Sequence, residues 1–108
     1  MRRRLRFSII YAPEVARHVQ AIEVKHHRLI RQAIETQLSF VPGERTRNRK
    51  PLEDLPGPFD SRWELRCGPA NRFRVFYEIA RSSRQVWVLA IGVKDRERLI
   101  IAGEEFDP

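Results

Sequence analysis

The sequence predicts an α+β domain of two layers, in which helices cover one face of an antiparallel sheet. Three observations predict it: a helical pattern in the first third of the chain, three consecutive strand-like segments after residue 60, and short connections between those strands. Strands joined by short turns pair antiparallel, because a parallel pair needs a long crossover. We expect the order strand, one or two helices, three strands and a last helix, forming one domain over residues 1–108.

The N-terminal third predicts a strand followed by helix. Leu5–Tyr11 is rich in β-branched and aromatic residues and is the expected first strand. Pro13 and Glu14 then suit the first turn of a helix. Apolar residues recur at spacings of three and four from there to Phe40, as in an amphipathic helix. One long helix and a helical pair broken near Glu23–His26 both fit this pattern, and the pair is slightly preferred.

An irregular segment follows at Gly43–Ser61. It contains three prolines and a basic cluster, Arg45–Lys50. Such a segment runs over the surface, and we expect its large apolar side chains to pin it to the core, namely Leu52, Leu55 and Phe59.

The three strands that follow alternate between apolar and charged residues. In the first strand Glu64 and Arg66 alternate with apolar residues, and in the second Arg74 does the same. Successive strand side chains point to opposite faces, so the sheet has an apolar face under the helices and a cationic face open to solvent. Phe76 shares the parity of Arg74 and is the aromatic candidate for stacking on a base. The third strand, Val86–Val93, is apolar on both faces, as expected of a buried central strand.

The last segment, Asp95–Phe106, is expected to form a short helix. Asp95 is a favourable N-cap residue, and Gly103 would end the helix.

Composition limits the classes of function. Lys and Arg number 21 against 14 Asp and Glu, a net charge of +7. Arginine dominates the basic residues, and its guanidinium suits bidentate contacts with phosphate. The apolar runs are too short for a membrane span, and the N-terminal one is too short for a signal peptide. The single cysteine, Cys67, has apolar parity, which favours a buried inert thiol in a cytosolic protein.

Each candidate residue also has a purely structural interpretation. Arg66 and Arg74 are either solvated outer-face residues or phosphate contacts, and the Arg45–Lys50 cluster is either a charged loop or a nucleic-acid contact. Trp63 has core parity, so packing is favoured over base stacking. The three histidines lack the spacing and partners of a metal site, and no metal is expected.

The ordered combination KPLEDLPG, WELR, a glycine turn, FRVFYEI and VLAIGVKDRE resembles the RelE/ParE superfamily of toxins from type II toxin–antitoxin systems. The resemblance covers Leu5 to Phe106 and is most specific between Lys50 and Arg98. It implies a two-layer toxin fold neutralised by an acidic antitoxin segment, partly disordered when free, that wraps across its surface. RelE-type members cut mRNA in the ribosomal A site, whereas ParE-type members inhibit DNA gyrase and lack a nuclease site.

The resemblance also implies a cytoplasmic endoribonuclease that needs no metal or other cofactor, in which the RNA 2′-hydroxyl attacks the adjacent phosphate. That reaction needs a base, an acid, and cations for the developing charge. Carried over residue by residue, the implied catalytic residues are Arg74, Arg66, Lys94 and Arg96. From their charge, or for Phe76 its parity, the residues expected to contact RNA or the ribosome are Arg45, Arg47, Arg49, Lys50, Arg72 and Phe76.

Two positions depart from the family pattern. Glu64 stands where a catalytic lysine is expected, and no tyrosine follows Tyr77. Glu64 suits the role of base if a neighbouring arginine holds it in place. A ribosome-dependent mRNA endonuclease is therefore the leading hypothesis. A ParE-like gyrase inhibitor, which needs no nuclease site, is the alternative, and a non-toxic binding protein on the same scaffold is the third.

Overall fold

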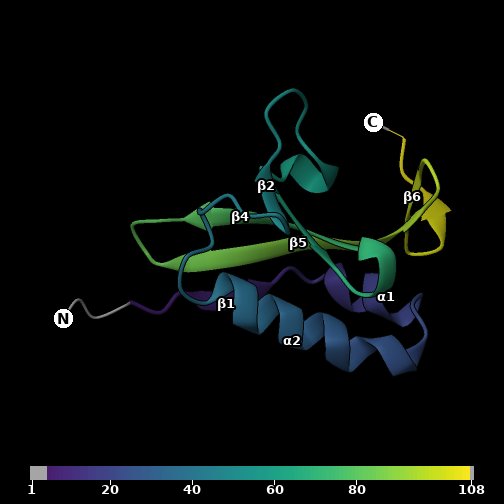
Figure 1. Cartoon of the computed structure of the whole chain (residues 1–108), viewed down its shortest axis with the longest axis horizontal. Coiled ribbons are helices and arrows are strands. Elements are labelled where there is room, and N and C mark those ends of the chain that lie inside the picture. Colours follow the sequence, from purple (N-terminus) through teal and green to yellow (C-terminus); the bar gives the residue numbers. More distant parts are fainter. Residues whose placement is uncertain (1–4, 108) are drawn as a thin grey trace.

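The computed structural model describes residues 5–107 and confirms a two-layer α+β architecture (Figure 1). The strands β2 to β7 form one continuous antiparallel path in chain order, and β1 joins the same sheet by pairing parallel to β5. The elements are β1 (Ser8–Tyr11), α1 (Val15–Gln20), α2 (His27–Leu38), β2 (Arg49–Pro51), β3 (Trp63–Cys67), β4 (Phe73–Ala80), β5 (Gln85–Asp95), β6 (Arg98–Ile101) and β7 (Glu104–Glu105).

Both helices lie on one side of the sheet, below it in Figure 1. The expected helical pair is confirmed: α1 ends at Gln20, a 3-10 turn spans Val24–His26, and α2 starts at His27. The His27 ring closes this connection, with Nε2 2.7 Å from the carbonyl oxygen of Ile22. The main core lies between the helices and the sheet and includes Val15, Ile30, Ile34, Leu38, Leu65, Phe73, Val75, Tyr77, Val86, Val88 and Ile91.

A β-bulge in β5 explains why this strand looked apolar on both faces. Phe76 pairs with Ala90, but the next residue, Tyr77, pairs with Val88, so one residue of β5 is skipped. The skip reverses the alternation of β5, and a bulge has this effect wherever two residues oppose one. Val88 and Ile91, although three residues apart, therefore both reach the helix-side core.

The expected C-terminal helix is wrong, because residues 98–105 form the antiparallel strands β6 and β7. Arg96, at φ 57°, makes a tight turn after β5. A second turn carries positive φ at Ala102 and Gly103. The apolar residues of β6 explain this outcome. Leu99 and Ile101, two residues apart, both pack on an apolar cluster on the side of the sheet opposite the helices. Residues two apart share one face of a strand, whereas in a helix they point to different sides.

This C-terminal hairpin covers part of the face that we expected to be open. A second apolar cluster forms on the side opposite the helices around Phe76, Ala90 and Ile101, with Leu52, Leu99, Ala102 and Phe106 packed against it. Of the expected loop anchors, Leu52 packs there, Phe59 stacks instead on the buried ring of His18, and Leu55 is exposed. Two parts of this face stay open: the end near the β3–β4 turn, which we call the open end, and the region around Trp87, which is 38% exposed. Between residues 5 and 107, no helix has the length and apolarity needed to cross a membrane.

Candidate phosphate-binding and catalytic site

The open end of the outer face brings together charged residues from three adjacent strands. The register pairs Lys50 of β2 with Glu64 of β3, and Arg66 of β3 with Arg74 of β4. Side chains directly opposite each other on one face lie within about 5 Å at Cβ. We call Lys50, Glu64, Arg66 and Arg74 the outer-face cluster.

Glu64 is the centre of this cluster. Arg66 Nε donates to Glu64 Oε1 at 3.1 Å, and Arg74 Nη1 donates to Oε2 at 3.5 Å. Each carboxylate oxygen therefore holds one arginine. Glu64 is buried, while the side chains of Arg74 and Arg66 are 14% and 33% exposed, so both guanidiniums remain accessible from solvent.

The turn between β3 and β4 fixes the second arginine. Arg74 Nε also donates to the carbonyl oxygen of Asn71 at 2.9 Å. Gly68 begins this turn at φ +80°, where a Cβ would lie 2.4 Å from the Phe73 ring. Only glycine fits such a position without strain. Gly68 therefore permits the turn that brings the carbonyl oxygen of Asn71 to Arg74.

The cluster is suited to holding an anion beside a proton acceptor. A guanidinium has five N–H donors, and each arginine spends only one on Glu64, so donors remain for phosphate oxygens. Glu64 supplies the only carboxylate among these four residues, so the group carries a net charge of +2. The sequence predicted that Arg66 and Arg74 lie together on the face away from the helices, and the register places them there.

Two further cations border the cluster. Lys94 of β5 lines the same pocket as Glu64, and its Nζ donates to the carbonyl oxygen of Glu97 at 3.5 Å. Arg72 is exposed beside the glycine turn and stacks its guanidinium 5.7 Å from the Phe73 ring centroid. Arg96 lies exposed in the β5–β6 turn, and Arg45 and Arg47 lie exposed before β2.

Two expected contact residues do not reach the surface. Arg49 was expected in an open loop, but it begins strand β2, where alternation turns its side chain toward the helices. It is buried, and Nη1 donates to the carbonyl oxygens of Gln37 at 2.5 Å and Val41 at 2.7 Å. Phe76 has the expected parity, but the C-terminal hairpin and Leu52 cover it. The short strand β2 was not predicted from the sequence. A strand at residues 49–51 paired with β3 would have placed Arg49 on the helix side of the sheet.

Two further groups able to donate or accept protons, Tyr77 and Cys67, lie in the core on the other side of the sheet. Tyr77 is fully buried, donates its hydroxyl to the carbonyl oxygen of Pro42 at 2.8 Å, and has a pKa raised by burial. Cys67 is buried, as expected, and burial raises the pKa of its thiol to about 11. Within residues 5–107, no group of three or more His, Cys, Asp or Glu side chains is arranged to hold a metal ion.

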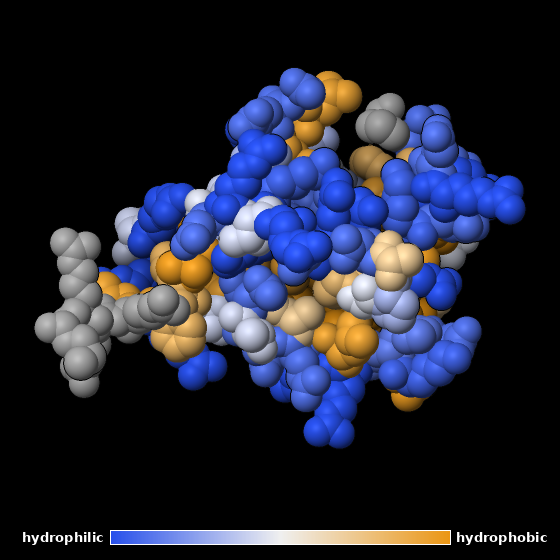
Figure 2. Space-filling view, viewed as in Figure 1, coloured by the Kyte–Doolittle hydropathy of each residue, from blue (hydrophilic) through white to orange (hydrophobic). Residues whose placement is uncertain are grey.

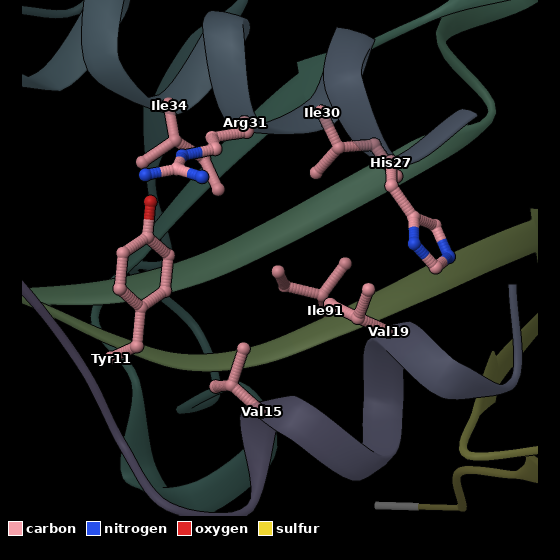
Figure 3. A pocket seen from close by; sticks show the side chains of 8 residues that line it. All are labelled: Tyr11, Val15, Val19, His27, Ile30, Arg31, Ile34 and Ile91. Atoms are coloured by element: carbon pink, nitrogen blue, oxygen red, sulfur yellow. The ribbon is translucent and has the colours of Figure 1, made fainter. Parts of the chain in front are cut away.

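A cleft with a volume of about 410 Å³ lies on the opposite side, between the two helices and β5 (Figure 3). Aliphatic side chains line most of it, and the Tyr11 hydroxyl points toward the Arg31 guanidinium at one end. Burial, followed by the nearby Glu35 carboxylate, raises the pKa of Tyr11. The walls of this cleft are therefore mostly apolar, in contrast to the charged outer-face cluster.

Figure 2 shows that hydrophilic side chains dominate the surface above the sheet, around the outer-face cluster. In the loop between β2 and β3, the apolar side chain of Leu55 is 68% exposed. The outer side is therefore a largely polar surface between two raised walls, the loop and the C-terminal hairpin (Figure 1).

Comparison with known proteins identifies the fold. No protein-family model matches the sequence, and no curated protein matches it significantly. Among solved structures, the chain is similar to a chain in the crystal structure of the archaeal RelE–RelB complex from Pyrococcus horikoshii OT3. The match has a TM-score of 0.55 at 20% sequence identity and covers 83% of this chain and 97% of the archaeal one. The arrangement of strands and helices is therefore a RelE-like fold.

Proposed function

We propose that this protein is the toxin of a type II toxin–antitoxin module and that it cleaves mRNA in the ribosomal A site. One observation carries the proposal: Glu64 is held between two partly exposed arginines on the open end of the sheet of a RelE-like fold. This arrangement supplies a proton acceptor and two phosphate ligands within one cluster. The proposed action on ribosomes places the protein in the cytoplasm.

In the proposed reaction, Glu64 accepts the proton of a ribose 2′-hydroxyl, and the 2′-oxygen bonds to the adjacent phosphorus. Arg66 and Arg74 bind the nonbridging oxygens and stabilise the extra negative charge of the transition state. The bond from phosphorus to the 5′-oxygen then breaks, leaving a 2′,3′-cyclic phosphate and a 5′-hydroxyl.

Lys94 is assigned to protonating the leaving 5′-oxygen. It lines the same pocket as Glu64, and no tyrosine reaches this cluster. Arg96, Arg72 and Lys50 are assigned to the neighbouring RNA backbone. Arg45 and Arg47, on the exposed segment before β2, are assigned to ribosomal RNA.

Primer extension on mRNA incubated with purified protein and programmed ribosomes tests the proposal. We expect stops within the A-site codon for the wild-type protein and none for the Arg66→Ala/Arg74→Ala variant with an unchanged circular dichroism spectrum. If the wild-type protein produces no stops, the nuclease proposal fails.

A ParE-like gyrase inhibitor remains the second candidate, because no tyrosine side chain lies in the outer-face cluster. A supercoiling assay with the protein in stoichiometric excess separates the two. Gyrase that works normally removes this candidate, and inhibited gyrase together with intact mRNA would replace the nuclease. Growth arrest on induction without an antitoxin excludes the third candidate, a non-toxic scaffold.

An antitoxin is the proposed partner. The similar archaeal chain was crystallised in a RelE–RelB complex. This chain carries a net charge of +7, so an acidic segment that orders on binding and covers the outer-face cluster is the partner whose charge fits it.

A further inference from the structure

A second pocket adjoins the outer-face cluster and is not explained by phosphate binding. It has a volume of about 280 Å³ and lies between the loop after β2 and the C-terminal hairpin. Leu52 lies on the loop side, Leu99 and Phe106 lie on the hairpin side, and Phe76 belongs to the sheet beneath. Glu64 lines the same pocket, so the pocket opens directly beside the proposed reaction centre.

The hairpin wall depends on a glycine in β5. Gly92 is the neighbour of Arg74 in the sheet. A Cβ at this position would lie 2.9 Å from the carbonyl oxygen of Ile100 and 3.0 Å from a methyl group of Leu99. Because glycine stands here, β6 folds closely over β5 and holds Leu99 against the pocket. The wall is therefore part of the folded sheet and not a chance contact of a mobile loop.

The pocket is lined by cations as well as carboxylates. Lys94 Nζ donates to the carbonyl oxygen of Glu97 at 3.5 Å, and Arg98 Nη2 pairs with Asp95 at 3.6 Å, so the carboxylates at the rim are left to accept hydrogen bonds from a ligand. Glu97 and Glu105 line it and are exposed. Within residues 5–107, neither carboxylate takes part in an ion pair. Glu104, the chain neighbour of Glu105, instead lines a separate pocket, near His18.

We propose that this pocket takes the nucleobase next to the scissile phosphate and favours a base with an amino group over uracil. The inference rests on the proposed function and names the part of the substrate that the site recognises. The pocket volume is just below the ~300–1,000 Å³ that is typical of small-molecule pockets, so it suits a ligand as small as a single base.

The chemistry of the pocket supports this choice of ligand. Apolar and aromatic walls bury the faces of a base, and stacking on aromatic side chains is worth about 1–3 kcal/mol per base in other proteins. Carboxylates accept hydrogen bonds from the amino group of cytosine. They repel the carbonyl oxygen that uracil carries at the same position, so cytosine and uracil are the sharpest pair for comparison.

Methyl and arginine NMR signals recorded during titration with cytidine 5′-monophosphate, uridine 5′-monophosphate and ribose 5-phosphate test the inference. We expect cytidine monophosphate to shift the methyl signals of Leu52 and Leu99 and to bind about tenfold or more tightly than uridine monophosphate, as for one good base contact. Ribose 5-phosphate should shift only the arginine Nε signals of Arg66 and Arg74.

Two matched double variants isolate the rim carboxylates. Glu97→Gln/Glu105→Gln should bring the two nucleotide affinities within about twofold of each other. Glu53→Gln/Glu104→Gln makes the same change in net charge outside this pocket and should keep the wild-type preference.

The contrary outcomes separate this inference from the proposed function. Equal affinity for both nucleotides, or leucine shifts with ribose 5-phosphate alone, overturns the base pocket. Arginine shifts without any leucine shift also overturn it, while leaving the phosphate site in place. If no phosphate compound shifts the Arg66 or Arg74 signals, the proposed reaction centre itself is contradicted.

Discussion

Glu64 sets the properties of the site at the scale of single residues. A lysine at this position would repel both arginines, whereas the carboxylate draws Arg66 and Arg74 to its two oxygens. The guanidiniums are thus ordered before a substrate arrives. Electrostatic stabilisation is largest when such groups need no rearrangement during the reaction.

Removal of one guanidinium tests this arrangement. We expect Arg74→Ala to lower the cleavage rate by about 10²–10³, as for the loss of one donor from an oxyanion site. The control is Arg28→Ala, which removes an exposed guanidinium from α2 on the other side of the sheet. Single-turnover cleavage on programmed ribosomes is the measurement, and equal rates for the two variants would contradict the role of Arg74.

Alternation along β3 and β4 was enough to predict these residues from the sequence. It placed Arg66 and Arg74 on one face and Trp63 on the other, where Trp63 stacks 6.0 Å from the Tyr77 ring. It did not reveal the burial of Arg49 and Phe76. That burial depends on β2 and on the C-terminal hairpin, neither of which alternation within β3 and β4 can report.

At the scale of elements, the His18 side chain occupies a break in the strand pairing along one edge of β5. The pairing of β1 with β5 reaches Val88, and that of β6 with β5 begins at Val93. Between them the backbone N–H of Ile91 donates to His18 Nδ1 at 3.3 Å. The His18 side chain is buried and packs on the Phe59 ring.

This contact predicts a pH dependence of stability. Burial, followed by the nearby Arg17 charge, lowers the pKa of His18 below 6.5, and Glu14 opposes the shift. The unfolded chain then binds a proton more readily than the folded one, so stability rises with pH through this range. The contribution of His18 is complete above pH 6.5 and is lost as the pH falls below it.

Urea denaturation of the wild-type protein and His18→Gln between pH 8 and pH 5 measures this contribution. Glutamine keeps an acceptor for Ile91 without titrating. The wild-type protein should lose more stability than the variant below pH 6.5. Parallel curves for the two proteins would show that His18 does not supply the dependence.

Arg49 joins the end of α2 to β2. The last four carbonyl groups of a helix lack partners within it, and Arg49 donates to the one on Gln37. We expect Arg49→Ala to lower the free energy of unfolding by at least about 1.5–3 kcal/mol, since a hydrogen bond to a charged group is worth this much. Arg47→Ala, two residues earlier and exposed, should change it by less than about 0.5 kcal/mol. Chemical denaturation measures the free energy of unfolding of both variants. Similar losses of stability in the two would refute the structural role of Arg49.

The C-terminal segment shows where local sequence signals were insufficient. Asp95 and Gly103 fit the two ends of a helix, but Asp95 ends strand β5 and Gly103 lies in the turn between β6 and β7. The decisive contacts are long-range, because Leu99 and Ile101 pack against Phe76 and Ala90 of the preceding strands. Tertiary burial of this kind overrides local preference.

At the scale of the whole molecule, two layers separate two surfaces. The helices close one face of the sheet, while the loop before β3 and the C-terminal hairpin rise from the other (Figure 1). The order and alternation of the strands predicted this division. The parallel pairing of β1 with β5 was not predicted, since it joins segments more than seventy residues apart.

The net charge of +7 predicts how the proposed antitoxin would associate with this protein. Association with an acidic partner should be steered electrostatically, so its on-rate should fall by about tenfold or more between low salt and near-molar salt, as the screening length shrinks from ~30 Å to ~3 Å. Stopped-flow measurements with the cognate antitoxin provide the rate. An on-rate that does not change with salt would show that charge does not guide the encounter.

The most direct test of the account uses an mRNA with a single 2′-deoxynucleotide 5′ of the scissile phosphate in the A-site codon. Attack by the 2′-oxygen, assisted by Glu64, Arg66 and Arg74, predicts rapid cleavage of the all-RNA message to a 2′,3′-cyclic phosphate end and no cleavage of the deoxy-substituted one. Cleavage of both messages at similar rates, or a product with another end, would contradict it.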